Sequence, residues 1–327
     1  MTAPGAAFPA LTGDGARRLL DSRDRVVVVG AGGWLGLATL EALRETLGAT
    51  FSDRVVCFGS NERTLALRGG TVIAQRPLAE LAALPPAPSL VLHLAFLTQE
   101  KAKLMSDAAY VGANAAISGA VLDALGPIGA RAVFVASSGA VYMADDEAAE
   151  ASKRLYGALK RDDEARFAAW ARDAGKRTVI ARVFNVSGPY INKQSSYALA
   201  CFIADALADR PIAVKAPRPV WRSYVAISEL MSVVFGAMTE AESGCVSFDT
   251  AGDEVLEMAD IARVVGEGLA SPHAMERPPL GDLPPDRYFG DGAVYRSLRR
   301  GYGVESVSFS CQVDETARFM AQAAQVG

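Results

Sequence analysis

The sequence of 327 residues contains few of the residues that build metal centres and disulfide frameworks. Its four cysteines are Cys57, Cys201, Cys245 and Cys311. They lie far apart and form no CxxC pair, which argues against a zinc site and against a disulfide framework. Only His93 and His273 are present, too few for a histidine-rich metal site. We therefore expect no bound metal, and unpaired cysteines favour a reducing cytoplasm.

Positive charge and long apolar runs are also scarce. The net charge is -4 and the arginines are spread along the chain, so a nucleic-acid surface is not indicated. No stretch approaches the roughly 20 apolar residues that a membrane span needs, and residues 1–24 have no apolar signal core. We expect a cytoplasmic protein that binds neither nucleic acid nor membrane. Half of the residues are hydrophobic, enough for one large domain or a domain with a smaller appendage.

A glycine-rich turn after an apolar strand is the most informative motif. Residues 25–29 read Arg-Val-Val-Val-Val, and four consecutive β-branched residues suit a parallel strand buried on both faces. Three glycines follow at three-residue spacing, which lets the chain turn and lets a pyrophosphate approach the backbone at a helix N-terminus. The residues assigned to dinucleotide binding here are Gly30, Gly33, Trp34, Leu35 and Gly36. The alternative is a glycine-rich turn that binds no ligand.

The end of the next predicted strand, residues 54–58, bears on the choice of dinucleotide. A carboxylate at that position commonly binds the adenosine ribose, whereas an arginine nearby accommodates a 2′-phosphate. The chain continues Gly-Ser-Asn-Glu-Arg, so Ser60 and Arg63 are placed to contact a phosphate. This slightly favours NADP over NAD. Two alternatives stay open, that Glu62 binds the ribose and that Arg63 is a solvated surface residue.

The rest of the chain alternates strand and helix patterns. In the first half we predict helices at 34–47 and 98–125, and strands at 71–74, 89–95 and 131–137. This alternation predicts an α/β fold with a doubly wound parallel sheet and a ligand crevice at the carboxyl ends of its strands. In the second half we predict a helix at 195–209, strands at 211–214 and 245–249, a helix at 256–269, and a proline-rich loop at 272–285 over the substrate mouth. Residues 1–24 are expected to form a loosely held N-terminal extension.

Three positions carry candidate chemistry. Ser138 ends a strand at the expected crevice. Tyr156 and Lys160 are four residues apart on one helix face, where an ammonium favours the phenolate and makes the phenol a usable acid–base. Such a pair also occurs as surface decoration. Asn114 interrupts an apolar helix and must find partners, either for helix packing or for function.

Taken together, these motifs resemble the extended short-chain dehydrogenase/reductase family, the NAD-dependent epimerase/dehydratase group that modifies nucleotide sugars. The resemblance spans residues 25 to about 319 and rests on residues 30–36, the strand end at 93–95, Asn114, residues 137–142, Tyr156 with Lys160, residues 182–189 and residues 221–230. It implies an enzyme with a Rossmann sheet and a smaller, discontinuous substrate-binding region. The implied division is residues 25–185 and 224–252 for the dinucleotide domain, and 186–223 and 253–327 for the substrate region.

The resemblance also implies roles for single residues. Tyr156 would be the acid–base during hydride transfer, Lys160 would hold the nicotinamide ribose, and Ser138 would hydrogen-bond the reacting oxygen. Asn114 would steady the lysine through a water or a backbone contact. The remaining implied residues are Ala95 for the cofactor, and Asn185 and Arg222 for the phosphate-bearing half of the substrate. A salt bridge to a local acid is the alternative for Arg222, and a turn cap is the alternative for Asn185.

One departure from the family pattern narrows the reaction. Gly139-Ala140 stands where dehydratases of the family carry an Asp-Glu pair, which disfavours dehydration. The acidic run at residues 145–150 is predicted to be a solvated loop, and if it bordered the crevice it would repel a pyrophosphate. We predict an NAD(P)-dependent epimerase or ketoreductase of a nucleotide sugar, active as a homodimer. The alternatives are a reductase of a small carbonyl compound and a dinucleotide-sensing protein without turnover.

Overall fold

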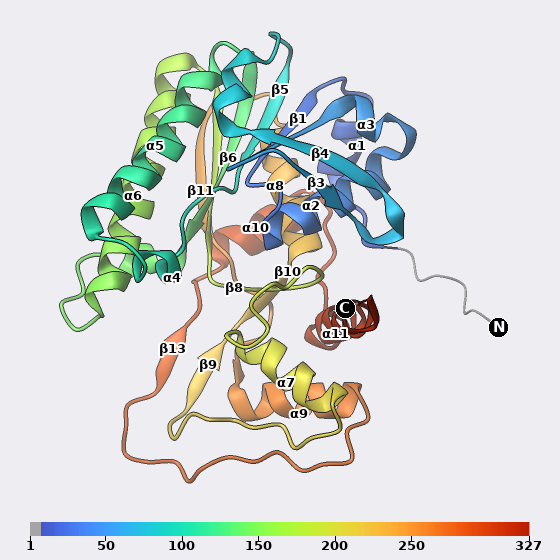
Figure 1. The fold of residues 1–327 in the computed structure, drawn as a ribbon, viewed down its shortest axis with the longest axis vertical. Helices are drawn as coiled ribbons and strands as arrows, with labels where there is room; N and C mark the ends of the chain where they lie inside the picture. The colour runs from blue at the N-terminus through green and yellow to red at the C-terminus, as the bar shows by residue number, and fades with distance from the viewer. Residues whose placement is uncertain (1–7, 327) are drawn as a thin grey trace.

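The computed structural model describes residues 8–326 and contains one large sheet of eight strands (Figure 1). The strands, in spatial order, are β11 (Gly244–Asp249), β7 (Arg177–Val183), β6 (Ala130–Ser138), β5 (Ser89–His93), β1 (Arg25–Val29), β2 (Val55–Gly59), β4 (Val72–Pro77) and β3 (Arg63–Ala66). Every pair is parallel except β3 with β4. The predicted doubly wound α/β sheet is confirmed.

Both faces of the sheet are covered by helices. The side chains of Val26 and Val28 join one hydrophobic cluster, those of Val27 and Val29 join the other, and all four are fully buried. Helices α5 (Asp107–Leu125) and α6 (Ala151–Ala174) cover one face, and α2 (Trp34–Leu47) and α8 (Ile227–Met238) cover the other (Figure 1). The run of valines is therefore buried on both sides, as predicted.

The strict alternation of strand and helix predicted for the chain is wrong between β2 and β5. Strand β3 forms an antiparallel hairpin with β4, and the chain turns through a short 3-10 helix, η2 (Arg68–Gly70). Only a 3-10 helix, η3 (Leu78–Ala83), connects β4 to β5. Prolines at 77, 85, 86 and 88 explain this, because they exclude a longer α-helix from the connection.

The helix predicted at 98–125 is two helices, α4 (Gln99–Ala102) and α5. The second begins at its own cap, where the Ser106 hydroxyl accepts from the Ala109 amide at 3.3 Å. By length and composition α5 meets the criterion for a membrane span, contrary to the sequence prediction. Helices that pack in the cores of soluble proteins pass the same test, and the buried face of α5 packs against the sheet.

The described part of the N-terminal extension is packed against the domain, so the prediction that it is loosely held is wrong there. Helix α1 (Gly13–Asp21) lies against α8, and its Leu19 is fully buried. The Asp14 amide donates to the Tyr302 carbonyl at 2.8 Å. Residues 1–7 of the predicted extension lie outside the described residues. The apolar residues Leu11 and Leu19 indicated this packing, but the high content of Ala, Gly and Pro favoured the interpretation as a loose extension.

Two small sheets lie beyond the carboxyl edge of the large sheet (Figure 1). Strands β8 (Asn185–Ser187) and β10 (Tyr224–Ala226) pair with each other, and β9 (Val220–Arg222) lies between β12 (Leu256–Glu257) and β13 (Asp286–Tyr288). The predicted strand at 211–214 is only a single bridge between Ala213 and Glu276.

Helices α7, α9 and α11 pack together beside these sheets, and α10 lies against β11 and α8. Their bounds are α7 (Ala198–Leu207), α9 (Met258–Gly268), α10 (Ala293–Gly301) and α11 (Phe309–Val326). The remaining short elements are η1 (Gly48–Thr50), α3 (Phe51–Arg54) and η4 (Gly139–Met143).

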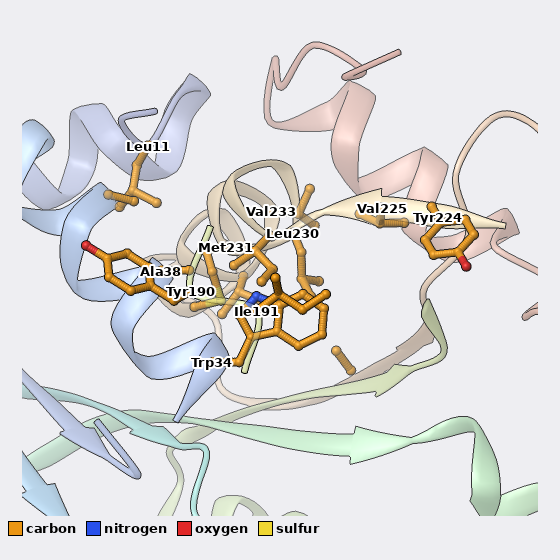
Figure 2. Packing of buried hydrophobic residues seen from close by; sticks show 14 of the residues in the cluster. Leu11, Trp34, Ala38, Tyr190, Ile191, Tyr224, Val225, Leu230, Met231 and Val233 are labelled. Carbon is orange, nitrogen blue, oxygen red and sulfur yellow. The ribbon is translucent and has the colours of Figure 1, made fainter. Parts of the chain in front are cut away.

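One hydrophobic cluster continues from the large sheet into this second part. Figure 2 shows Trp34 of α2 and Leu230 and Met231 of α8 together with Tyr190 and Ile191, which follow β8. All five side chains are buried. The two parts therefore share one core.

A buried polar cluster reinforces that junction. The Glu41 carboxylate on α2 is paired with the Arg68 guanidinium and accepts a 2.8 Å hydrogen bond from the Tyr190 hydroxyl. The same hydroxyl accepts from the Arg68 amide at 2.8 Å. Glu315 of α11 lies 4.0 Å from Arg68, and burial raises the pKa of Glu315. We call Glu41, Arg68, Tyr190 and Glu315 the junction cluster.

Candidate active site

A cavity of about 880 Å³ lies where the carboxyl ends of β1, β5, β6 and β7 face the small sheets. This is within the size range of small-molecule sites. It is lined by the glycine-rich turn, by the start of α6, by residues 191–202, and by parts of β9 and β13. The predicted crevice is at this edge. None of residues 272–285 lines the cavity, so the loop predicted over the substrate mouth is not part of the cavity wall.

The glycine-rich turn opens one end of the cavity. Gly30 has a φ of 89°, and a Cβ there would lie 2.6 Å from the Ala95 amide nitrogen, so only glycine fits. Ala95 is thereby placed against the turn. A Cβ at Gly33, the residue before α2, would have only the Gly30 carbonyl oxygen within 4 Å, at 3.4 Å. The helix N-terminus is therefore accessible to an anion.

The two apolar residues of the motif lie beside that helix N-terminus. Trp34 and Leu35 both line the cavity, as does Gly36. The Trp34 indole donates to the Pro189 carbonyl at 2.8 Å, and its ring lies 5.2 Å from the Tyr197 ring. Trp34 thus joins the turn to the segment after β8 that also lines the cavity.

Three of the predicted catalytic residues meet on one side of the cavity, and we call Ser138, Tyr156 and Lys160 the inner wall. Ser138 ends β6 and its hydroxyl accepts from the Ala140 amide at 3.2 Å. Tyr156 and Lys160 come from the first turns of α6. Gly157 permits this approach, because a Cβ there would lie 2.1 Å from the Ala140 carbonyl oxygen. The sequence Tyr-Gly-x-x-Lys therefore brings the phenol to the serine.

Burial shifts the proton equilibria of the inner wall. Burial lowers the pKa of Lys160 to about 8, because the ammonium is removed from water. Its Nζ donates to the Ala136 carbonyl at 2.8 Å and lies 3.7 Å from the centre of the Phe96 ring. Burial raises the pKa of Tyr156, and hydrogen bonding with Ser138 acts in the opposite direction.

Asn114 bonds to the backbone of two residues and makes no direct hydrogen bond with Lys160. Its Oδ1 accepts from the Leu97 amide at 2.8 Å and its Nδ2 donates to the Tyr110 carbonyl at 3.2 Å. The contacts with Leu97 and Tyr110 fix the loop after β5, and Asn114 has no direct bond to the lysine. That loop carries Phe96, whose ring faces Lys160, so the influence of Asn114 on the ammonium passes through the loop.

Arg63 lies beside the glycine-rich turn, on β3 of the hairpin. A Cβ at Gly32 would be 1.5 Å from the Arg63 Nη2, so the guanidinium covers the backbone of the turn. Ser60, in the loop after β2, is exposed and donates to the Asn61 Oδ1 at 3.2 Å. The strand end that would carry a ribose-binding carboxylate is Gly59. Arg63 is therefore close to the turn and Ser60 is more peripheral.

The opposite side of the cavity is formed by β9 and β13, and we call Arg218, Arg222, Asp286 and Tyr288 the outer wall. All four line the cavity. Arg222 makes two 3.1 Å hydrogen bonds to the Asp286 carboxylate, the local salt bridge considered as its alternative. Asn185 also lines the cavity, but its Nδ2 donates to the Ser223 and Tyr288 carbonyls at 3.2 and 3.0 Å. The amide group of Asn185 therefore ties β8 to the outer wall.

Tyr288, Asp286 and Arg218 were missed in the sequence. Ser138 acts on the pKa of Tyr288 and on that of Tyr156 in the same direction, opposite to burial, and all three side chains line the cavity. Burial, the larger effect, raises the pKa of Tyr288. A polar and aromatic triplet, Asp-Arg-Tyr, after two prolines was the only local signal.

The acidic run at 145–150 does not border the cavity. Asp145 is exposed and pairs with Arg161 on the outer surface of α6, with oxygen–nitrogen distances of 2.5 and 3.0 Å. None of residues 145–150 is among the cavity-lining residues. It is a solvated loop, as predicted, and it does not repel an anion in the cavity.

Comparisons with known proteins agree with this architecture. The model of the NAD dependent epimerase/dehydratase family matches residues 26–247. A search of curated proteins gives no match.

Solved structures are similar over nearly the whole chain. A UDP-N-acetylglucosamine 4-epimerase from Methanobrevibacter ruminantium M1, in complex with UDP-N-acetylmuramic acid, has a TM-score of 0.70 at 18% identity, covering 92% of this chain and 99% of that one. WbmF from Bordetella bronchiseptica, in complex with NADH, has a TM-score of 0.73 at 18% identity, covering 94% and 95%. A UDP-glucose 4-epimerase from Thermotoga maritima, with UDP-glucose, has a TM-score of 0.68 at 16% identity, covering 92% and 99%. At these identities the likeness concerns the fold.

Proposed function

The chain belongs to the NAD dependent epimerase/dehydratase family, and from this premise we propose that it is an NAD(P)-dependent epimerase of a nucleotide sugar. One observation carries the proposal. A single cavity holds the glycine-rich turn, the Ser138–Tyr156–Lys160 wall, and arginines on the opposite side. Such a cavity brings a dinucleotide site, an acid–base and an anion site within reach of one another.

The residues present fit a dinucleotide. The open N-terminus of α2 at Gly33 and the close approach at Gly30 form a cradle for a pyrophosphate. Lys160 is placed to bind the nicotinamide ribose, as the resemblance implies. When bound, the nicotinamide would accept a hydride from the sugar and return it.

The protein's own part is proton transfer and orientation. In this proposal the Ser138 hydroxyl binds the reacting oxygen of the sugar while the Tyr156 phenolate takes its proton. Because burial raises the pKa of Tyr156, the phenolate needs a nearby positive charge to form, and in this proposal Lys160 supplies it. In the reverse half of an epimerisation the same phenol returns the proton to the sugar oxygen, after the keto sugar has turned its other face towards the dinucleotide site.

Arg63 supports a preference for NADP over NAD, which we also propose. Its guanidinium lies over the turn, and no carboxylate stands at Gly59 where a ribose ligand would be expected. The structures of WbmF with NADH and NAD+ show that similar folds bind the dinucleotide without the extra phosphate. Arg63 is exposed, so its preference is a modest one.

A ketoreductase is the second candidate, because it would use the same inner wall and differ only in releasing its cofactor. Reduction of a small carbonyl compound would be favoured if Arg222 proved unnecessary. A dinucleotide-sensing protein without turnover has no need of an acid–base, and the complete inner wall argues against it.

We further propose a cytoplasmic homodimer. All four cysteines are free, in keeping with a reducing compartment. The outward face of α5 is lined by small residues such as Ala115 and Ala116, which are exposed and would allow a close helix–helix contact with a second copy. Light scattering coupled to gel filtration would test this, with a monomer mass as the contradicting result.

The first test is mass analysis of the nucleotide released when the purified protein is denatured without added cofactor. Stoichiometric NAD(H) or NADP(H) would support an epimerase that retains its dinucleotide. An empty protein that then binds NADPH would support the ketoreductase. Binding of neither dinucleotide would contradict the proposal.

A further inference from the structure

Asp286 occupies the face of the outer wall where an anionic substrate would bind. Its two carboxylate oxygens each accept from Arg222 at 3.1 Å, and one lies 3.6 Å from Arg218 Nη2. All three side chains line the cavity. The two arginines therefore already hold an anion that belongs to the protein.

A second arginine–carboxylate pair on the same small sheet is built differently. Glu257 accepts from Arg277 at 2.7 and 2.8 Å, and also from the backbone amides of Val220 at 3.0 Å and Ala259 at 2.7 Å. These bonds hold the pKa of Glu257 at about 2 against the effect of burial. Neither Glu257 nor Arg277 lines the cavity. This pair joins β9 to α9.

The Asp286 carboxylate has no such backbone donors among the described contacts; its side-chain hydrogen bonds are those from Arg222. Its side chain is 33% exposed, compared with 13% for Glu257. A partly exposed carboxylate can return to water with little desolvation change. Removing it from the arginine leaves no buried backbone amide without a partner. Asp286 is therefore exchangeable, and Glu257 is not.

We infer that Asp286 is a built-in competitor that an incoming diphosphate must replace on Arg222 and Arg218. The inference rests on the proposed function in taking the anion to be the diphosphate of a nucleotide sugar. It makes Asp286 a specificity-determining residue of the substrate site.

The reason is a difference between anions. A single phosphate on Arg222 replaces one two-oxygen contact by another, so it gains little from the exchange. A diphosphate has oxygens on two phosphorus atoms and can contact Arg222 and Arg218 together. The cost of displacing Asp286 from Arg222 is common to both kinds of ligand, and only a diphosphate offsets it with a second arginine contact. Asp286 thus sets a threshold of affinity that diphosphates pass and monophosphates do not.

The test compares Asp286→Asn with the matched control Asp282→Asn. Asp282 is exposed, lies four residues earlier in the same segment, and does not line the cavity. Affinities for UDP, UMP, inorganic pyrophosphate and phosphate are measured by calorimetry on wild type and both variants. Asp286→Asn should tighten the binding of each of the four anions by about threefold to fivefold, the scale of one partly exposed ion pair. Asp282→Asn should change each dissociation constant by less than about twofold.

Unchanged or weaker binding in Asp286→Asn would overturn the inference, because Asp286 would then hold Arg222 in place for the ligand. A melting temperature within a few degrees of wild type checks that the variant folds, and Asp286→Ser provides a second replacement.

Failure of the proposed function is a separate result. In one outcome Asp286→Asn binds pyrophosphate and phosphate more tightly, as predicted, while nucleotide sugars are neither bound nor converted. The inference that Asp286 competes with anions would then be supported, and the proposed function would be contradicted. In the other outcome nucleotide sugars are converted, but Asp286→Asn binds the anions no more tightly than wild type. The proposed function would then be supported, and the inference that Asp286 competes with anions would be contradicted.

Discussion

The positively charged residues of the inner and outer walls of the cavity differ in how their charge is balanced. On the inner wall the Lys160 ammonium is buried against a carbonyl and an aromatic ring, and its pKa is lowered to about 8. On the outer wall Arg222 is paired with Asp286, and Arg277 behind it is paired with Glu257. Among the described residues Lys160 has no carboxylate at ion-pair distance, and Asp163 and Glu164 act on its charge only from further away, whereas Arg222 and Arg277 each contact a carboxylate directly.

This difference indicates that the inner-wall cation serves the reaction and that the paired arginines mainly serve the stability of the fold. A buried charge without a directly bonded counter-charge destabilises the fold and is available to act on a ligand. A compensated one contributes to stability and must exchange partners before it binds anything. We therefore expect substitutions on the inner wall to affect turnover most, and substitutions behind the outer wall to affect stability most.

The largest expected effect is on the inner wall. Tyr156→Phe should lower kcat by about a thousandfold while leaving dinucleotide binding intact, because it removes only the proton-transferring hydroxyl. Tyr288→Phe is the matched control, since Tyr288 lines the same cavity as Ser138 but belongs to the outer wall. The control should lower kcat by less than about tenfold. Steady-state kinetics with the nucleotide sugar measures kcat for both variants. Equal losses of kcat would contradict the assignment of proton transfer to the inner wall.

The next effect is on stability behind the outer wall. Glu257→Gln should lower the free energy of unfolding by about 1–3 kcal/mol at pH 7, because it weakens the charge-assisted bonds from Arg277 and two amides. Asp260→Asn, an exposed neighbour in the first turn of α9, should have little effect.

The pH dependence sharpens this expectation. The folded pKa of Glu257 is depressed from 4.5 to about 2, so its contribution to stability is present above pH 4.5 and is lost as the pH falls through 2. Urea unfolding at pH 7, 4 and 2.5 should show the gap between wild type and Glu257→Gln closing towards low pH. A gap that stays constant would rule out the ion pair as its source.

Lys160 should show the reverse behaviour at high pH. Its folded pKa is lowered from 10.5 to about 8, so the unfolded chain binds more protons between these values and stability rises with pH across that window. Below pH 8 the folded protein carries the cost of the buried ammonium. Lys160→Met should therefore stabilise the dinucleotide-free protein by about 1–3 kcal/mol at pH 7, while abolishing most activity. Thermal unfolding of wild type and Lys160→Met at pH 7 and pH 10 measures the difference in stability. A variant less stable than wild type at pH 7 would contradict the expectation.

The smallest expected effect concerns the far end of the dinucleotide. Arg63→Ser should weaken NADPH by about threefold to tenfold relative to NADH, because an exposed guanidinium contributes modestly to a 2′-phosphate. Fluorescence titration of both dinucleotides gives the ratio. Glu62→Gln, the exposed neighbour, is the control and tests the alternative in which Glu62 binds the ribose. An NADH-specific loss in that variant would favour the alternative.

The inner wall could be predicted because each of its parts is local in sequence. Spacing placed Ser138 at a strand end and Tyr156 with Lys160 on one helix face, and the family resemblance supplied the roles proposed for them. The outer wall could not, because Arg222 and Asp286 meet only through pairing of β9 with β13, two strands of three residues each. Strands that short have no alternating pattern to read.

Two other differences have the same origin. Asn114 was recognised as a buried amide, but its partner Leu97 lies in an irregular loop that no periodicity defines. Arg63 was predicted to lie near a phosphate, but the hairpin of β3 and β4 that brings it to Gly32 was not predicted. A short edge strand and a loop have similar sequence patterns. Partners formed by tertiary contacts are beyond what local patterns can assign.

The junction cluster has a consequence for how the molecule comes apart. Glu41 is held by Arg68 and Tyr190, which lie 27 and 149 residues further along the chain. Opening the cleft widely would leave the fully buried Glu41 carboxylate without part of its bonding, which is unfavourable in an apolar surrounding. The two parts are thus expected to melt in one cooperative transition, and substrate is expected to enter through local movement of loops instead of a separation of domains.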